Sequence, residues 1–285
     1  MTALGIVFRP QIAPEKLRPV AEAADRAGLD ELWLWEDCFD EGGISTAAAA
    51  LAWTERLHVG IGVLPVPLRS PALMAMEIAT LCRMFPDRVE VGLGHGVQEW
   101  MDQVGVRVES PMTLLREYVA VVQSLLVGDT VTADGRYVHM RDVSLGWPPA
   151  HRPRLHVGAV KPKTVALAGE LADGLILTGG STPDDVRAAR QNYDAARGNR
   201  AGRVTVYLVA VTGADAAAAL DAEARHWGFD PSADFGAAGD ARAIASAVRR
   251  WADAGADAVV LQPRAEDDPV AFARFAGEQV RPLLG

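Results

Sequence analysis

The sequence predicts an α/β protein of the (β/α)8 TIM-barrel class, and three observations support this prediction. Short runs rich in β-branched residues alternate with longer helical segments along the 285 residues. The strand segments are apolar throughout, which is typical of a parallel sheet covered on both faces. Eight strand and helix units follow one another, and about 250 residues is the usual size of such a barrel. We expect residues 1–285 to form one domain.

The expected strands are short apolar segments, at residues 3–8, 31–35, 57–64, 89–93, 154–160, 174–179, 204–211 and 257–263. The expected helices each follow one of these strands, at residues 14–28, 44–54, 71–85, 110–126, 163–172, 183–197, 241–255 and 269–280. In the first helix Leu17, Val20, Ala24 and Ala27 recur at helical spacing, and Gly28 is placed to end it. The third begins at Pro71, a residue favoured in a first helical turn.

Two insertions interrupt the repeating pattern, one after the fourth strand and one after the seventh. Residues 129–148 contain an Asp-Gly pair between short polar strands, which predicts a hairpin. Residues 212–238 form a polar, Ala-rich insertion. A doubly wound open sheet is the alternative fold, but it normally carries a GxGxxG motif after its first strand, and RPQIAP follows here.

Composition excludes several classes of partner. A net charge of −9 and the lack of a basic run disfavour nucleic acid, and no apolar run is long enough to span a bilayer. Cys38 and Cys82 have neither CxxC spacing nor a disulfide framework, so a reducing cytoplasmic setting is expected. The six histidines are scattered, and we expect no metal site.

Chemistry in such barrels lies at the carboxyl ends of the strands, so the residues after each strand are the candidates. WEDCFDEGG (35–43) places Glu36 and Asp37 beside Trp35, where each carboxyl is either a proton donor or a cap for the next helix. Cys38 has no nearby His or Lys to activate it as a nucleophile. Arg69, after the third strand, either reaches an anionic ligand or is a surface residue.

The run VGLGHG (91–96) follows the fourth strand. Gly92, Gly94 and Gly96 alternate, so on an extended strand they leave a bare strip for a flat ring. His95 stands between them as a hydrogen-bonding group.

Three glycine-rich segments lead into helices, at residues 158–163, 178–185 and 235–243. Backbone amides at a helix start favour an anion, and Lys161 and Lys163 add positive charge to the first of them. In the second, Ser181 or Thr182 is also suited to cap the helix. Together the segments suggest a phosphate-bearing ligand whose flat ring reaches the glycine strip.

Three longer segments resemble the luciferase-like flavin and deazaflavin oxidoreductases. Residues 54–96 and 155–180 are similar to the two signature regions of that family, and residues 251–263 to its closing strand. The resemblance covers nearly the whole chain and implies a TIM barrel that binds FMN or the deazaflavin coenzyme F420 non-covalently. It also implies a cis peptide bond at Gly62–Val63 or Val63–Leu64.

The resemblance further implies which residues hold the cofactor. Its phosphate is expected at Gly158, Ala159, Val160 and Lys161, with Gly179 and Gly180 in the next loop. An Asp-His pair common in F420-dependent members is Asp37-Cys38 here, and the glutamate of the family's sugar-phosphate dehydrogenases is Val97. Glu36, Asp37 and His95 therefore remain the candidates for the proton donor.

These observations favour an oxidoreductase that exchanges hydride between F420 and a small organic substrate. An FMN-dependent monooxygenase, served by a separate reductase, and a flavin-binding barrel without catalysis are the alternatives. A phosphosugar isomerase or aldolase would need a lysine or glutamate base at a strand end, and none is evident. The anionic tail of F420 would require a basic rim, for which the candidates are Arg69, Lys161, Lys163, Arg152 and Arg154. The family resemblance also implies a homodimer formed near the Ala-rich helix at 44–53.

Overall fold

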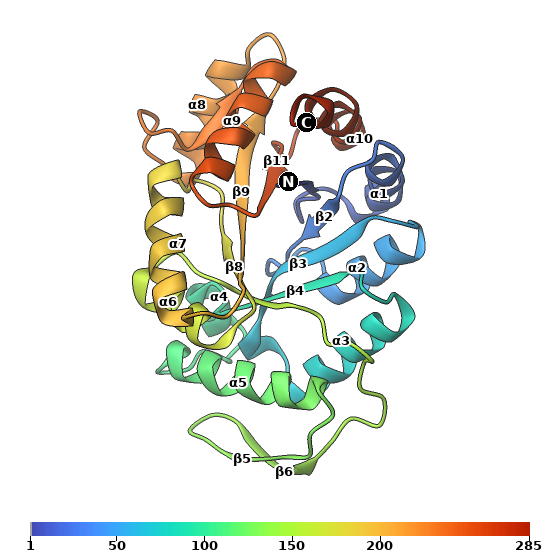
Figure 1. The fold of residues 1–285 in the computed structure, drawn as a ribbon, viewed down its shortest axis with the longest axis vertical. Helices are drawn as coiled ribbons and strands as arrows, with labels where there is room; N and C mark the ends of the chain where they lie inside the picture. Colours follow the sequence, from blue (N-terminus) through green and yellow to red (C-terminus); the bar gives the residue numbers. More distant parts are fainter. Residues whose placement is uncertain (1) are drawn as a thin grey trace.

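Eight parallel strands close into a barrel in the computed structural model, which describes residues 2–285 (Figure 1). In chain order and around the barrel they are β1 (Ala3–Val7), β2 (Glu31–Leu34), β3 (His58–Pro65), β4 (Val89–Gly94), β7 (Leu155–Gly158), β8 (Gly174–Leu177), β9 (Arg203–Val211) and β11 (Ala258–Gln262). The pairing of β11 with β1 closes the ring, with Gly5 opposite Val260. The predicted TIM barrel is confirmed.

A helix follows each barrel strand and covers its outer face (Figure 1). The eight are α1 (Leu17–Arg26), α2 (Gly43–Ala52), α3 (Pro71–Met84), α5 (Pro111–Leu126), α6 (Pro162–Leu171), α7 (Pro183–Arg197), α9 (Ala241–Asp253) and α10 (Pro269–Arg274). Their apolar stripes face the sheet, as Ile244, Val248 and Trp251 of α9 do. The expected helices are confirmed, except that α10 continues as a π-helix over Phe275–Val280.

Both predicted insertions are present. β5 (Val131–Asp134) and β6 (His139–Val143) form the hairpin, which lies outside the barrel beyond α5 (Figure 1). Glu117 of α5 anchors it by accepting hydrogen bonds of 2.8, 2.9 and 3.1 Å from the amides of Arg136, Tyr137 and Val138. The second insertion forms α8 (Ala216–Trp227) and β10 (Gly236–Ala238), which extends the sheet beside the end of β9. A short α4 (Gln98–Gln103) after β4 was not expected.

Glycines inside the barrel make room for large side chains of neighbouring strands. A Cβ atom on Gly60 would lie 2.4 Å from the Trp33 ring, and one on Gly174 would lie 2.0 Å from Nδ1 of His156. Both large side chains are completely buried. The barrel is therefore a packed core and not a pore.

The amino-terminal end of the barrel contains a network of buried charges. Arg203 of β9 pairs with Glu31 of β2 and, at 3.1 Å, with Glu90 of β4. Glu90 also contacts Nε2 of His156 at 2.7 Å and Nη1 of Arg154 at 2.7 Å. Burial raises the pKa of Glu90, but the His156 hydrogen bond and the nearby charges outweigh it and bring this pKa below its usual value.

A cavity of about 1030 Å³ opens at this end, and Arg152 and Arg154 line it. The expectation that these two arginines join a basic rim at the active end is therefore wrong. They precede β7, so they lie at the amino-terminal end of the barrel and not at the end where the strands finish. Arg152 is bound instead to Asp173. This end of a TIM barrel is the one associated with stability, while catalysis takes place at the opposite end.

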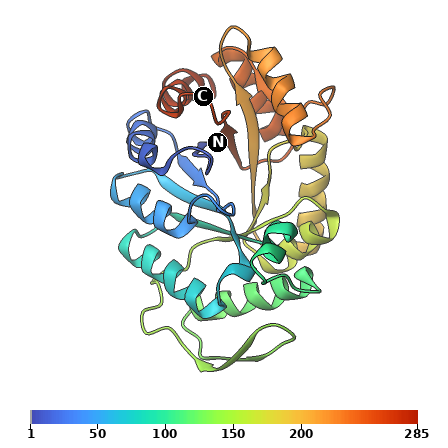
Figure 2. The same cartoon turned by 180° about the vertical axis from the view of Figure 1, so that it is seen from behind.

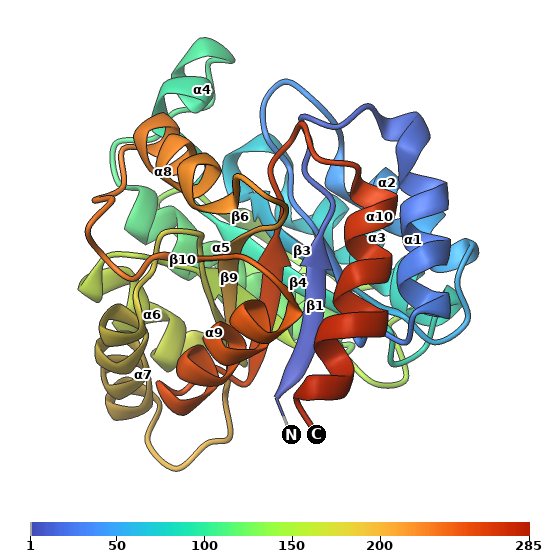
Figure 3. The same ribbon diagram turned by 90° about the horizontal axis from the view of Figure 1, so that it is seen from above.

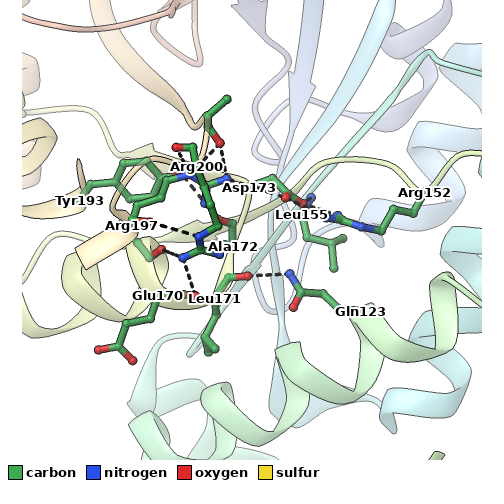
Figure 4. Close-up of polar contacts among 12 residues, drawn as sticks. Gln123, Arg152, Leu155, Glu170, Leu171, Ala172, Asp173, Tyr193, Arg197 and Arg200 are labelled. Carbon is green, nitrogen blue, oxygen red and sulfur yellow. Dashed lines mark hydrogen bonds and ion pairs between the residues drawn. The ribbon is translucent and has the colours of Figure 1, made fainter. Parts of the chain in front are cut away.

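Side chains from other elements bind the free carbonyls at the carboxyl end of α6 (Figure 4). The four carbonyls of residues 169–172 are the ones that a helix leaves without a backbone partner. Arg200 donates to the first two at 2.7 and 2.9 Å, Gln123 donates to the third at 2.6 Å, and Arg197 donates to the fourth. Two of the three donors are cations, which the helix dipole also favours at this end.

Candidate active site

The loops that follow the strands gather at the end of the barrel where α4 and α8 lie (Figures 2 and 3). Trp35 and Val63 pack there on a small cluster inside the barrel, formed by Val7, Trp33, Ile176, Tyr207 and Val260. This end, the mouth of the barrel, is where the chemistry was expected.

Asp37 is held at the mouth by two neighbours. Nε1 of Trp35 donates to its Oδ2 at 2.8 Å, and Nε2 of Gln11 donates to the same oxygen at 3.4 Å. Burial raises the pKa of Asp37 above its usual value, and the two hydrogen bonds only partly oppose this. Because both bonds end on Oδ2, Oδ1 is the oxygen available to a substrate or a proton.

Glu36 does not fit the expected role of proton donor. Its two oxygens accept hydrogen bonds of 2.9 and 3.0 Å from the guanidinium of Arg69, and Oε2 also accepts from the amide of Gly43 at 2.9 Å, where α2 begins. Its helix-capping role is the one observed. Arg69 is neither free for an anion nor a surface residue, since it also approaches Glu77 at 3.4 Å.

The two cysteines are free thiols, and neither has the surroundings of a nucleophile. Burial raises the pKa of Cys38, and the charges of Glu36 and Asp37 raise it further. Burial raises the pKa of Cys82 to about 12. The peptide bond Cys38–Phe39 is cis, which was not expected.

Val63 covers the glycine strip that was expected to be bare. A Cβ atom on Gly94 or on Gly158 would lie 2.6 Å from a methyl group of Val63, and one on Gly92 would lie 3.2 Å from it. The expectation that a ring lies directly on this strip is therefore wrong, because side chains fill the space that the glycines leave. These are mainly Ile176 beside Gly92, Val63 beside Gly94, and Pro65 and Met101 beside Gly96. The cis bond is at Gly62–Val63, the first of the two expected positions.

His95 lies at the end of β4 with a half-buried ring. Burial lowers its pKa, so the imidazole is neutral at pH 7. Within residues 2–285, its Nδ1 is buried and has no hydrogen-bond partner. Such a polar atom is satisfied when a ligand supplies the partner.

The three glycine-rich helix starts differ in their caps. Thr182 and Asp185 form a capping box at α7, whose first turn also carries Asp184, and Asp240 caps α9 by accepting from Ala243 at 2.9 Å. Carboxylates at these two helix starts disfavour a phosphate. At α6 the N-cap Lys161 makes no side-chain cap bond, so only this start is suited to an anion.

The loop after β8, which contains Gly179 and Gly180, has only backbone to offer a ligand at these two positions. A Cβ atom on Gly180 would lie 2.5 Å from the ring of Phe229, which follows α8, and Gly180 has a positive φ of 91°. One on Gly179 would lie 3.1 Å from Oε1 of Gln262 at the end of β11. Gly179 and Gly180 therefore contribute bare backbone at this end of the barrel, with Gln262 and Phe229 packed against them.

Sequence reasoning did not find Tyr207, which lies in the middle of β9. Its hydroxyl donates to the carbonyl oxygen of Gly62 at 3.1 Å, and its ring stacks on Trp35 with 5.9 Å between centroids and 26° between planes. The only signal in the sequence is one aromatic residue with a polar tip in the apolar run VTVYLVAV.

Arg9 is the second residue that was missed, and it connects α8 to the mouth. It follows β1, is 3% exposed and lies 3.6 Å from Glu223 of α8. Its guanidinium also lies over the ring of Trp227 at 5.5 Å, and its Nε donates to Gln11 at 3.3 Å. The insertion after β9 is thereby tied to the residue that contacts Asp37.

Two further features concern cofactors and membranes. In the part of the chain that the structure describes, there is no group of three or more His, Cys, Asp or Glu side chains placed to hold a metal ion. No helix within residues 2–285 has the length and apolar character needed to cross a bilayer.

Comparison with known proteins agrees with this geometry. The family model of the luciferase-like monooxygenases matches residues 4–283. The 5,10-methylenetetrahydromethanopterin reductase of Methanolobus tindarius is 30% identical over 199 residues, which are 70% of this chain and 60% of the reductase. The F420-dependent glucose-6-phosphate dehydrogenase of Beutenbergia cavernae is 34% identical over 187 residues, 60% of this chain and 54% of that enzyme. The matched region thus spans somewhat over half the length of these relatives.

Solved structures of the same fold are also known. The structure of an F420-dependent secondary alcohol dehydrogenase in complex with an F420-acetone adduct superposes with a TM-score of 0.89. The superposition covers 100% of this chain and 99% of that one, at 20% identity. At this identity the likeness shows the fold.

Proposed function

Because the chain belongs to the luciferase-like monooxygenase family, we propose that it is an oxidoreductase in which bound F420 exchanges hydride with a small organic substrate. The observation that carries this proposal is the grouping, at one end of the barrel, of a half-buried carboxyl, an apolar wall and a basic helix start. These are Asp37, Val63 and the first turn of α6. Relatives that use F420 support the same cofactor.

The residues at the mouth fit such a cofactor. The amides of Lys161 and Lys163 at the start of α6, together with those of Gly179 and Gly180, would hold a phosphate, and the two lysine side chains would add charge. Pro162 has no N–H, and the amides of Thr164 and Val165 already donate to the carbonyl of Lys161. Val63 would support the ring, and Nδ1 of His95, which is buried without a partner in the described chain, would hydrogen-bond its polar edge. Gly92, Gly94, Gly158, Ala159 and Val160 shape this site through their backbone. When bound, the deazaflavin ring supplies or accepts the hydride.

Asp37 is the group that we propose to hold and move the proton. Its raised pKa brings it closer to neutral pH than an ordinary aspartate, which suits a general acid or base. Trp35 fixes Oδ2, so Oδ1 faces the substrate in a constant orientation. Glu36 is bound to Arg69, and the neutral His95 ring serves better as a binding group than as an acid.

An FMN-dependent monooxygenase remains the second candidate, because it is the activity from which the family takes its description. It would need a separate reductase to supply reduced flavin. A flavin-binding barrel without catalysis is the third.

Assembly and location belong to the same proposal. Leu73, Met76 and Met84 of α3 are 44%, 57% and 61% exposed, and such apolar exposure supports a homodimer through this side of the barrel. Two free thiols support a cytoplasmic location and argue against disulfide chemistry. We take residues 1–285 as one domain.

Titration of the purified protein with F420 and with FMN, followed by cofactor fluorescence, tests the proposal. We expect F420 alone to bind with a Kd of about 1 μM or tighter. Binding of FMN alone would favour the monooxygenase, and binding of neither would contradict both.

A further inference from the structure

Tyr207 makes two contacts that both end at the mouth of the barrel. Its hydroxyl is completely buried and donates to the carbonyl oxygen of Gly62 at 3.1 Å. Burial raises the pKa of this phenol well above its usual value, so the hydroxyl keeps its proton and remains a donor. The second contact is the stacking of the Tyr207 ring on the Trp35 ring.

The first contact determines where Val63 lies. Gly62 precedes Val63, and a Cβ atom on Gly62 would lie only 2.3 Å from the Tyr207 hydroxyl. The hydrogen bond therefore depends on glycine at 62, and it fixes the backbone from which Val63 extends over Gly94 and Gly158. A buried carbonyl that lost this donor would cost free energy, so the contact holds the backbone firmly.

The second contact determines where Asp37 lies. The stacked Trp35 ring has its centroid 5.9 Å from that of Tyr207, and the indole N–H donates to Oδ2 of Asp37 at 2.8 Å. The orientation of the indole therefore sets the orientation of the carboxylate. Tyr207 thus contacts both the backbone that carries Val63 and the indole that holds Asp37.

We infer that Tyr207 is a positioning residue of the active site, which orients the cofactor-facing Val63 through the Gly62 carbonyl and the Asp37 carboxylate through Trp35. It touches neither substrate nor cofactor. The inference rests on the proposed function for the identity of the ligand, but the geometry of Asp37 is a property of the protein alone.

The Tyr207→Phe variant tests the hydroxyl and keeps the ring. We expect the Kd for F420, measured by fluorescence titration, to rise roughly 3- to 10-fold, as for the loss of one net hydrogen bond. We also expect a shifted fluorescence maximum of the bound cofactor, which a loss of general stability would not produce.

Tyr193→Phe provides the matched control. Tyr193 is equally buried, and its hydroxyl approaches the carbonyl of Ala172 at 3.5 Å at the opposite end of the barrel. Its variant should bind F420 as the wild type does. Equal affinity and equal spectra for wild type and Tyr207→Phe, or equal losses in both variants, would overturn the inference.

A measurement on the cofactor-free protein separates the inference from the proposed function. In 15N-labelled protein the indole resonance of Trp35 should follow the ionisation of Asp37, and its titration midpoint should move in Tyr207→Leu, which removes the stacked ring, but stay constant in Tyr207→Phe, which keeps it. An unmoved midpoint would overturn the positioning of Asp37, even in a protein that binds F420. If Tyr207→Leu does not fold, Tyr207→Met tests the same arm, since it fills a similar buried volume without an aromatic ring to stack on Trp35. Failure of the wild type to bind either cofactor would contradict the proposed function alone.

Discussion

A methyl group of Val63 lies only 2.6 Å from the position that a Cβ atom would take on Gly94. No real side chain fits in that space, so the glycine is required by its neighbour. Val63 is in turn the residue that presents an apolar surface at the mouth.

Gly94→Val should displace Val63 and weaken the binding of F420 by about 10-fold or more, since overpacking of this kind costs roughly 1–3 kcal/mol. Fluorescence titration measures the affinity, and circular dichroism shows whether the fold is kept. Gly146→Ala is the control, because nothing lies within 4 Å of a Cβ atom at that position. Normal binding by a folded Gly94→Val protein would show that the wall does not form the site.

Asp37→Asn should have opposite effects on activity and stability. Loss of the proton carrier is expected to lower turnover by about 10²- to 10⁴-fold. Because the folded pKa of Asp37 is raised, the folded state binds more protons than the unfolded one above the ordinary aspartate pKa, so ionisation costs stability at neutral pH. The amide removes that cost, and the variant should unfold in urea at pH 7 at the same or a higher midpoint. A variant with full turnover would exclude Asp37 from catalysis.

Glu36→Gln should mainly destabilise the protein. The variant leaves Arg69 half-buried without its bidentate partner, for which a loss of about 2–4 kcal/mol is expected from buried pairs of this kind. Urea unfolding measures this loss. The pH dependence of turnover in the remaining folded protein should match that of the wild type, and a shifted profile would return Glu36 to the proton donors.

His95→Gln should make the protein less sensitive to acid. The pKa of His95 is lowered in the folded state, so the unfolded state binds more protons as the pH falls through the ordinary histidine range near 6.5. The stability that this group contributes is present above that range and is lost below it. Urea unfolding at pH 7, 6 and 5 should show a smaller decline for His95→Gln than for the wild type. His139→Gln, at an exposed position on the hairpin, should decline as the wild type does.

Arg197→Met should lower stability without changing the mouth. Arg197 is 7% exposed and donates to the carbonyls of Arg200, Ala201 and Ala172, so its loss removes a donor from the buried Ala172 carbonyl at the carboxyl end of α6. We expect a decrease of about 2–3 kcal/mol in the free energy of unfolding. The Kd for F420 should stay constant, and a change in it would show that the two ends of the barrel are coupled.

The barrel and its order of elements were predictable because each strand and helix carries a local pattern. Apolar runs such as the one at 204–211 and helix starts such as Pro71 act over a few residues, and the order of strands in a barrel then follows the order of the chain. The short α4 was missed because six residues carry too little periodicity to distinguish a helix from a loop.

The site was predictable only as far as strand ends can be located. Asp37 and His95 follow strands directly, and both lie at the mouth as expected. Other residues of the site have partners in distant segments. Arg69 binds Glu36 across 33 residues of sequence, and Tyr207 binds Gly62 across 145. A single sequence contains no signal for such pairs. The prediction of a bare glycine strip was wrong for the same reason. The pattern of glycines does not reveal which side chain fills the space above them.

The pairing of Arg203 with Glu31 and Glu90 has a consequence for synthesis on the ribosome. The two carboxylates precede their cation by 172 and 113 residues. A nascent chain that has emerged only through β8 already contains Arg154 and His156 as partners of Glu90, but it would have to bury Glu31 without a cation, which is unfavourable. Closure of the barrel is therefore delayed until β9 is released.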